Sequence, residues 1–375
     1  MYNILTLNKI SELGLDKFSD RYLYGDDIAA PDAVMVRSAS MHDMELAPET
    51  VAVARCGAGT NNIPSDKFAQ SGVVVFNTPG ANANSVKELV ICAMLLASRK
   101  IIPGIEWCVD LKCGCGETGV SKAVEKGKSA FVGPELKGKT LGIVGLGAIG
   151  RLVGEAAAAL GMSVIGYDPF TTGGNGTQIK IVGGIDEVFA ESDYISLHAP
   201  GTAQTKNMIN RDTLKLMKDG VRIINFARGD LVNSADILEA LKSGKAAAYA
   251  TDFPTEEQLG VDGVIAIPHL GASTPESEDN CAAMAAGELM LYLETGAIKN
   301  SVNFQEAALS DDFAERTCVF SASGAAAAVK SILGETVFSA EQNGIVYTVA
   351  DKAADKAALE AVDGVIRVRL LSKSS

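Results

Sequence analysis

Short apolar runs alternate with helical patterns along most of the chain. Near the N-terminus, apolar runs predict strands at residues 4–7, 33–37, 51–55 and 73–76, and a helical pattern covers 64–71. Alternation of this kind is typical of a parallel sheet with helices on both faces, so we expect a first doubly wound domain.

Two long helical patterns border a second alternating region. One covers residues 85 to about 105 and the other 275 to about 294, and the first is followed by a polar, glycine-rich stretch at 112–139. The apolar runs between the two patterns predict strands at residues 140–144, 162–167, 179–182, 194–198, 221–226, 247–252 and 264–267. This set is sufficient for a second, complete doubly wound sheet.

The tail after residue 302 has a different pattern and is rich in alanine. Strands are predicted at residues 317–320, 336–339, 345–349 and 365–370, and helices at 325–333 and 355–362. The order β-α-β-β-α-β predicts a small α+β module. It carries no histidine, so we expect it to regulate or assemble the protein and not to catalyse.

A glycine-rich turn follows the predicted strand at 140–144 and opens a helical pattern. Gly145 allows the tight turn, Gly147 lets a pyrophosphate approach the backbone, and Gly150 lets helix and strand pack closely. The helix N-terminus offers N–H groups and a partial positive charge to phosphates. Asp168 ends the next strand at about the expected spacing of 20 residues, where a carboxylate binds ribose hydroxyls and repels a 2′-phosphate. The stretch therefore predicts a dinucleotide site that prefers NAD to NADP.

Composition narrows the possible partners and the compartment. The formal charge of −13 disfavours nucleic acid and anionic membranes as partners. No apolar run is long enough to span a membrane and no secretory signal is evident, so we expect a cytoplasmic protein. Among the seven cysteines, Cys108, Cys113 and Cys115 cluster without a nearby histidine, so we expect no metal site.

The chain has three histidines. His42 lies in a polar turn and is expected at the surface. His198 and His269 each end a predicted strand, and the ends of parallel strands share the sheet edge at which ligands bind. We expect His198 to line the cofactor site.

Arg228, Asp252 and the pair Glu256–Glu257 follow other strands of the same predicted sheet. Hydride transfer from an alcohol requires a general base, which suits histidine near neutral pH. It also requires a carboxylate beside the base and a fixed cation for a substrate carboxylate. His269, one of the two glutamates and Arg228 can fill these roles.

Several stretches in a fixed order now point to a family: MVRSAS, ARCGAGTNNI, NTPGANANSVKELV, LGIVGLGAIG with YDP, SLHAPGTAQT, INFARGDLV, TDFPTEE and IPHLGASTPESEDN. The chain resembles the D-isomer-specific 2-hydroxyacid dehydrogenases, most closely their short members that oxidise 3-phospho-D-glycerate. The resemblance implies that Arg228 binds the substrate carboxylate, that His269 is the acid/base and that Asp252 contacts the nicotinamide carboxamide. The carboxylate partner of His269 is Glu256 when the letters of the motif are matched. It is Glu257 when residues are counted from Asp252. We prefer Glu256.

The resemblance also implies a site for a substrate phosphate. Arg37, Ser38, Arg55 and Asn82 match the positions at which phosphoglycerate enzymes hold that group, and we place Gly57 with them. Two of these residues are cations at predicted strand ends, as a site for an anion requires.

The implied activity is NAD-dependent oxidation of 3-phospho-D-glycerate to 3-phosphooxypyruvate, the first step of serine biosynthesis. The alternatives are a hydroxypyruvate or glyoxylate reductase of the same family and a non-catalytic NAD-sensing scaffold.

The expected cofactor contacts are Gly145, Gly147, Ala148, Ile149, Gly150, Asp168, His198, Ala199, Pro200, Thr205, Ala227, Asp252 and Gly271.

The resemblance assigns a domain to each predicted region. Residues 1–97 and 275–302 would form a flavodoxin-like substrate domain, 98–274 a Rossmann NAD domain, and 303–375 a shortened ACT-like module. The first loop of that module lacks the Asn and Pro often found there, so serine inhibition is not expected. A homodimer or homotetramer is implied.

Overall fold

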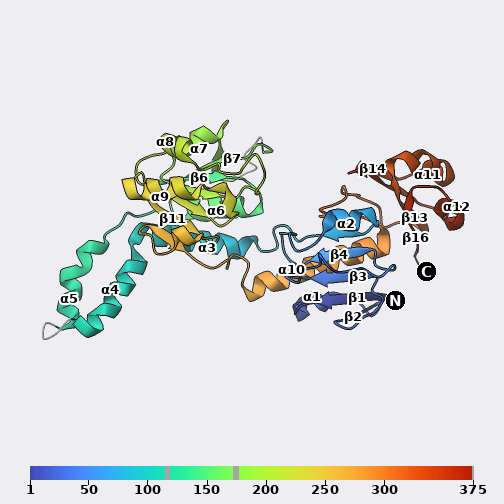
Figure 1. The fold of residues 1–375 in the computed structure, drawn as a ribbon, viewed down its shortest axis with the longest axis horizontal. Helices are drawn as coiled ribbons and strands as arrows, with labels where there is room; N and C mark the ends of the chain where they lie inside the picture. The colour runs from blue at the N-terminus through green and yellow to red at the C-terminus, as the bar shows by residue number, and fades with distance from the viewer. Residues whose placement is uncertain (115–118, 172–176, 374–375) are drawn as a thin grey trace. The chain divides into compact units, whose positions relative to one another are not determined.

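The computed structural model describes residues 1–114, 119–171 and 177–373, apart from the Cys113 side chain. Cys115 lies outside the described residues, so the predicted cysteine cluster is not described as a whole. The chain forms two units (Figure 1). Unit 1 comprises Met1–Asn82 and Pro275–Ser375, and unit 2 comprises Ala83–Thr274.

Unit 1 contains a five-stranded parallel sheet in the order β2-β1-β3-β4-β5. This is the doubly wound order of flavodoxin-like domains, which confirms the predicted class. The strands are β1 (Tyr2–Leu7), β2 (Tyr22–Gly25), β3 (Ala33–Val36), β4 (Ala52–Arg55) and β5 (Val74–Phe76), and the helices are α1 (Glu12–Leu15) and α2 (Ser65–Gln70). The sequence pattern missed β2 because this edge strand is short and two of its four residues are exposed.

Helix α10 (Pro275–Thr295) packs against this sheet and against α1. The close packing depends on Gly14 of α1, where an added Cβ would lie 2.2 Å from the Ala282 side chain. Cys281, Ala285 and Leu289 of α10 join the same buried core as Met35 of β3.

The C-terminal tail folds in the predicted β-α-β-β-α-β order, as a four-stranded antiparallel sheet arranged β14-β15-β13-β16. Its elements are β13 (Glu315–Ala322), η5 (Ser323–Ala325), α11 (Ala326–Leu333), β14 (Phe338–Gln342), β15 (Ile345–Ala350), α12 (Lys356–Glu360) and β16 (Val365–Ser372). The two central strands, β13 and β15, are buried along almost their whole length, and this burial accounts for the apolar runs from which they were predicted.

The tail module and the end of α10 are joined by side chains that contact helix carbonyls. The buried Arg316 donates to Thr295 O at 2.7 Å and pairs with Asp351 at 2.5 Å. Tyr347 donates to Gly296 O at 2.7 Å. These bonds satisfy carbonyl groups that a helix end leaves without intrahelical partners.

Unit 2 is built on a seven-stranded parallel sheet in the order β12-β11-β10-β9-β6-β7-β8. The six strands from β11 to β8 reproduce the Rossmann order, and β12 adds a seventh strand, so the predicted second doubly wound domain is confirmed. The strands are β6 (Thr140–Val144), β7 (Ser163–Tyr167), β8 (Ile179–Ile181), β9 (Tyr194–Leu197), β10 (Val221–Asn225), β11 (Ala246–Thr251) and β12 (Val264–Ala266). The flanking helices are α6 (Ala148–Ala159), α7 (Ile185–Glu191), α8 (Arg211–Leu216) and α9 (Ser234–Ser243).

The helix predicted over 85–105 is wrong as a single element. It is divided into α3 (Ala83–Arg99) and α4 (Ile101–Gly114) at Lys100, which has a φ of 46°. Pro103 explains the division, because proline is tolerated in the first turn of a helix and not in its interior. The polar, glycine-rich stretch at 112–139, for which no element was predicted, contains α5 (Val120–Gly127) and η2 (Lys128–Phe131).

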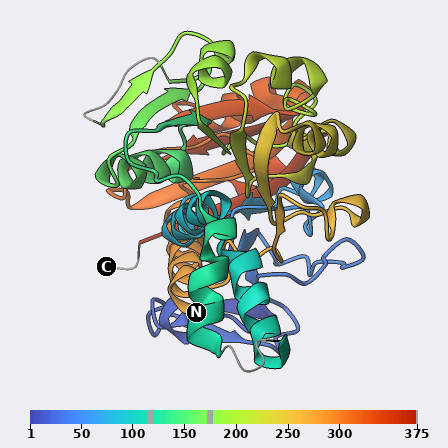
Figure 2. The same ribbon diagram turned by 90° about the vertical axis from the view of Figure 1, so that its left-hand side faces the viewer.

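Helices α4 and α5 pair side by side as an arm of unit 2 (Figures 1 and 2). Trp107 of α4 packs on Phe131 and on Gly127, where an added Cβ would lie 2.3 Å from the indole ring. Within the described part of the chain, no helix has the length and apolarity that a membrane crossing requires.

Candidate active site

The glycine-rich turn after β6 has the geometry that a dinucleotide needs. Gly145 has a φ of 95°, and an added Cβ there would lie 2.6 Å from His198 O. At Gly150 a Cβ would lie 2.1 Å from Gly145 O, so only glycine lets α6 approach the turn this closely. At Gly147 a Cβ would meet nothing within 4 Å, and this open space fits the approach of a pyrophosphate.

Asp168 lies directly after β7 and holds this turn. Its Oδ2 accepts a hydrogen bond from Leu146 N at 2.8 Å, and its Oδ1 accepts one from Phe170 N at 2.8 Å. Helix α6 begins after Gly147, and no side chain caps its N-terminus. Its first backbone N–H groups are therefore not taken up by a capping side chain and face the turn. A carboxylate beside this glycine turn suits an adenosine ribose without a 2′-phosphate.

His198 follows β9 and is not suited to act as an acid or base. Its Nε2 lies 2.9 Å from Ser196 Oγ, and burial lowers its pKa to about 4. The ring is therefore neutral near pH 7, whereas a general base works best with a pKa near the working pH. The loop that follows is held by Thr205, whose hydroxyl donates to Pro200 O at 2.6 Å.

The ends of β10 and β11, which are neighbours in the sheet, bring Arg228 and Asp252 together. Arg228 is exposed, and its Nη1 donates to Ala227 O at 2.7 Å. Asp252 is buried, and burial raises its carboxyl pKa to about 6, while the Arg228 guanidinium acts in the opposite direction. Gly271 follows β12, and a Cβ added to it would lie 3.8 Å from Asp252 Oδ2.

His269 also follows β12 and is exposed. Its ring packs on Phe253, with the ring centroids 4.5 Å apart. A Cβ added to Gly229, the residue after Arg228, would lie 3.1 Å from the Phe253 Cβ. A histidine, a cation and a carboxylate from three adjacent strands therefore lie within one site of unit 2.

The two candidate partners of His269 lie in the short helix η4 (Glu256–Gln258), and both are exposed. Glu257 Oε2 accepts a hydrogen bond from Thr255 Oγ1 at 2.9 Å, which ties this carboxylate to its own turn. The turn is fixed in place by the buried Gln258. The Glu256 carboxylate accepts no such bond from the described residues of the turn, and its pairing with His269 stays a prediction.

The residues predicted to bind a phosphate lie in unit 1. Arg37 and Arg55 are at the ends of the neighbouring strands β3 and β4. An added Cβ on Gly57 would lie 2.3 Å from Arg55 Nη1, so the missing side chain makes room for this guanidinium. Burial raises the pKa of the Cys281 thiol, and the charges of both arginines act in the opposite direction. Two cations therefore lie near one point of α10.

One contact in each unit was not foreseen from the sequence. Arg37 Nη2 lies 2.6 Å from Glu278 Oε1 of α10, and Phe253 packs on His269. Glu278 lies in the first turn of this helix, but nothing in a linear pattern identifies its partner. Ser38 donates its backbone N–H to Asn8 Oδ1 at 3.1 Å, and Asn82 ends the first segment of unit 1. His42 lies in a turn, with Nε2 2.9 Å from Asn61 O.

Comparisons with known proteins agree with this arrangement. Residues 91–271 match the model of the D-isomer specific 2-hydroxyacid dehydrogenase, NAD binding domain. The chain is 34% identical over 336 residues to a D-3-phosphoglycerate dehydrogenase of Bacillus subtilis, covering 84% of this chain and 61% of the relative. It is 40% identical over 259 residues to a hydroxypyruvate reductase of Thermotoga maritima, covering 66% of this chain and 80% of the relative.

The chain spans less than two thirds of the length of the phosphoglycerate dehydrogenase from Bacillus. Among solved structures it is similar to the NAD⁺-bound 3-phosphoglycerate dehydrogenase of Entamoeba histolytica, with a TM-score of 0.62 and 28% identity. That match covers 81% of this chain and 99% of the other.

Proposed function

Because the chain belongs to the D-isomer-specific 2-hydroxyacid dehydrogenases, we propose that it oxidises 3-phospho-D-glycerate to 3-phosphooxypyruvate with NAD, the first step of serine biosynthesis. The observation that carries the choice of substrate is the pair Arg37 and Arg55 at neighbouring strand ends of unit 1. Two guanidinium groups at one place suit a phosphate, which carries close to two negative charges at neutral pH. Ser38, Gly57 and Asn82 complete the proposed phosphate site.

The residues around the glycine turn fit NAD. Gly145, Gly147 and Gly150 would leave room for its pyrophosphate, and Asp168 would bind the adenosine ribose. When bound, NAD accepts the hydride from C2 of the substrate. The other proposed cofactor contacts are Ala148, Ile149, His198, Ala199, Pro200, Thr205, Ala227, Asp252 and Gly271.

The chemical step would use residues of unit 2. Arg228 binds the substrate carboxylate with the paired N–H donors of its guanidinium. His269 accepts the proton of the C2 hydroxyl as the alcohol is oxidised, and Phe253 limits the rotation of its ring. Glu256 is the carboxylate proposed to orient His269 and to stabilise its protonated form. The reverse reaction uses the same groups, with His269 returning the proton.

The alternative is a hydroxypyruvate reductase, which the similarity to the Thermotoga enzyme favours. The two activities differ in whether the substrate carries a phosphate. We therefore propose Arg55→Ala as the deciding variant, measured with NAD and 3-phosphoglycerate and, in the other direction, with NADH and hydroxypyruvate. A rise of KM of about tenfold or more for the phosphorylated substrate alone supports the proposal. Equal kinetics of wild type and variant on phosphoglycerate would refute it.

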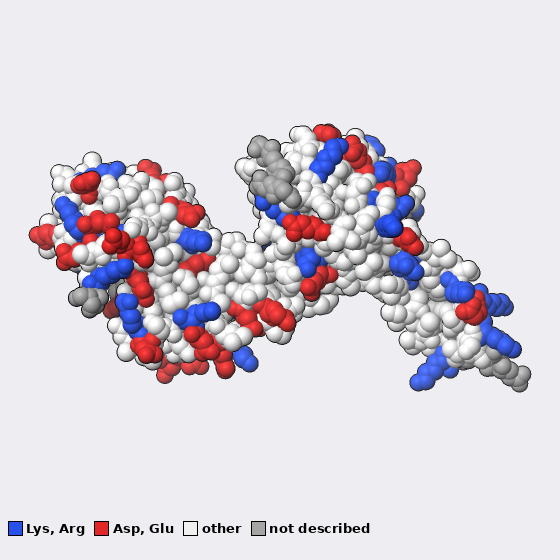
Figure 3. All heavy atoms as spheres, turned by 180° about the vertical axis from the view of Figure 1, so that it is seen from behind, with Lys and Arg blue, Asp and Glu red and all other residues white. Residues whose placement is uncertain are grey.

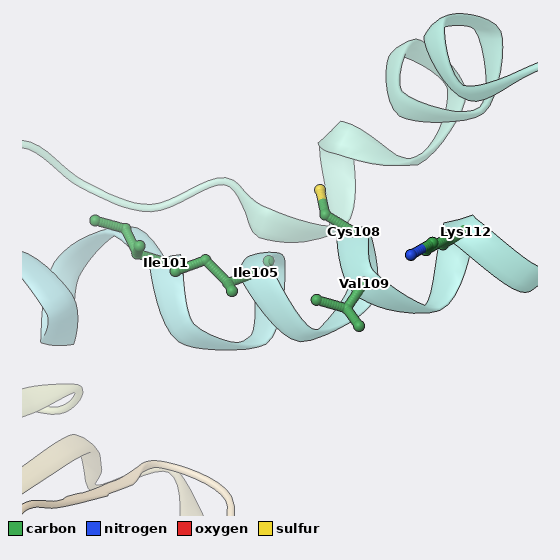
Figure 4. Close-up of a pocket in the computed structure, with 6 residues that line it drawn as sticks. Ile101, Ile105, Cys108, Val109 and Lys112 are labelled. Carbon is green, nitrogen blue, oxygen red and sulfur yellow. The ribbon is translucent and has the colours of Figure 1, made fainter.

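We further propose that two copies of the chain associate through the arm of unit 2. One face of α4 exposes Ile105 and Val109, which are 58% and 66% exposed. These side chains border an open hollow of about 640 Å³ whose lining also includes Ile101, Cys108 and Lys112 (Figure 4). Uncharged surface lies between the charged side chains of the arm in Figure 3, as expected for a surface that a second copy covers.

We retain the assignment of three domains as part of this proposal: residues 1–97 with 275–302 for the substrate, 98–274 for NAD, and 303–375 as an ACT-like module. The buried contacts of Arg316 and Tyr347 support a module that is firmly held within unit 1.

The proposed association of two copies is tested by comparing the sedimentation of the wild type with that of Ile105→Glu. The variant is expected to sediment as a monomer.

A further inference from the structure

We propose that Glu278 is a specificity-determining residue, which competes with a substrate phosphate for Arg37 and so reduces the preference for phosphorylated over unphosphorylated substrates. This inference rests on the proposed function, which places the phosphate at Arg37 and Arg55. The three residues belong to unit 1.

The contact that carries the inference is direct. Arg37 Nη2 donates to Glu278 Oε1 at 2.6 Å, the length of a charge-assisted hydrogen bond. The two residues are 241 positions apart, so the pair is a tertiary contact between the end of β3 and the first turn of α10. The carboxylate therefore occupies donors that a phosphate would otherwise use.

The helix holds Glu278 in place independently of any ligand. Ser11 donates to Asp279, the next residue of α10. One turn further, Ala282 packs on Gly14 without space for even a methyl group. At the other end of the helix, Tyr22 donates to Glu294 at 2.5 Å. Because α10 is fixed at both ends, the carboxylate stays near Arg37 and acts as an attached competitor.

The effect on specificity follows from charge. With Arg37, Arg55 and Glu278 together, the site carries one net positive charge and not two. A phosphorylated substrate must displace the Glu278 carboxylate or accept the weaker field. An unphosphorylated substrate leaves the ion pair intact and loses nothing. Glu278 therefore weakens only the phosphorylated class.

The exposure of the pair sets the size of the effect. Each side chain is 39% exposed, and ion pairs of this kind contribute little because water screens them. The range of measured coupling energies for such pairs corresponds to about a two- to five-fold change in affinity. We expect Glu278→Gln to raise kcat/KM for 3-phosphoglycerate by this factor and to leave kcat/KM for D-glycerate unchanged.

Glu276 provides a matched control in the same first turn of α10. It is exposed, it carries the same charge, and it forms no ion pair with any residue that the structure describes. Glu276→Gln removes one negative charge near the helix N-terminus without releasing Arg37. It should therefore leave the ratio of the two kcat/KM values at the wild-type value. In an Arg37→Ala background, Glu278→Gln should have a smaller effect, because no ion pair is left for the phosphate to break.

Inorganic phosphate serves as a second probe that does not require turnover. Its affinity is measured from the phosphate-dependent rise in the unfolding temperature of the full chain. Glu278→Gln should lower the Kd for phosphate by about two- to five-fold relative to Glu276→Gln. Equal phosphate affinities of the two variants would overturn the inference, whether or not the enzyme uses phosphoglycerate. Absence of turnover in wild type, together with a tighter phosphate site in Glu278→Gln, would refute the proposed function alone.

Discussion

Replacing Asp252 by asparagine is expected to stabilise unit 2 at neutral and alkaline pH. The side chain is 3% exposed, and burial raises its pKa from 3.8 to about 6, even though the Arg228 cation favours the ionised form. A carboxyl whose pKa is higher in the folded than in the unfolded state contributes stability below about pH 4. That contribution is lost as the pH rises through about 6. Above this pH the ionised Asp252 carboxylate lowers the free energy of unfolding, and an asparagine amide of the same shape avoids this loss.

The size of the cost follows from the shift. A change from 3.8 to about 6 corresponds to about 3 kcal/mol at pH 8, and to about 2 kcal/mol at pH 5.5, where the folded-state carboxyl is mostly protonated. An asparagine amide in the same place costs about 1 kcal/mol of its own when its hydrogen bonds are incomplete. We therefore expect a net gain of about 2 kcal/mol at pH 8 and about half of that at pH 5.5. For a unit of this size the gain at pH 8 corresponds to about 4–8 °C.

The assay is thermal unfolding of the purified protein at both pH values, followed by circular dichroism. Asp262→Asn is the matched control, because Asp262 is exposed in the loop before β12 of the same unit. If Asp252→Asn is no more stable than Asp262→Asn at pH 8, or if its advantage grows as the pH falls, the reasoning about burial is wrong. The same variant is expected to bind NAD more weakly, since Asp252 is a proposed contact of the nicotinamide carboxamide.

Two further predictions concern close packing. Gly150→Ala places a Cβ 2.1 Å from Gly145 O and should destabilise unit 2 by about 1–3 kcal/mol, whereas Gly147→Ala meets no protein atom and should weaken only NAD binding. Thermal unfolding and NAD titration of both variants separate the two effects, and equal unfolding temperatures would contradict the account. Arg316→Met removes a buried cation that binds Asp351 and Thr295 O, and should cost about 3 kcal/mol of stability in thermal unfolding. An unchanged unfolding temperature would show that these bonds do not stabilise the C-terminal module.

The sequence was sufficient for most of the fold because its apolar runs are regular. The central strands β6 and β9 of unit 2 are buried along nearly their whole length and read as continuous apolar runs, as parallel strands do. The division of the helix pattern at Lys100 was missed although Pro103 is a local signal for it. Strand β2 was missed because its two central residues, Leu23 and Tyr24, are exposed at the sheet edge.

The candidate site was predictable as far as strand ends determine position. Arg228, Asp252 and His269 follow neighbouring strands, and topology alone brings them to one edge. The contact between Arg37 and Glu278 was not predictable, because it depends on how α10 packs on the first sheet. The choice between Glu256 and Glu257 depends in the same way on the hydrogen bond from Thr255.

The measurement that tests the central claim most directly is the ratio of kcat/KM for 3-phospho-D-glycerate to that for D-glycerate. It is obtained with the purified wild-type protein and NAD by following NADH formation, with the keto product trapped. We predict a ratio well above ten that falls by about tenfold or more in Arg55→Ala, because the ionic contacts to the phosphate are each expected to contribute about 1.5–3 kcal/mol. A ratio near one in the wild type, with turnover of both substrates, would contradict the assignment of a phosphorylated substrate.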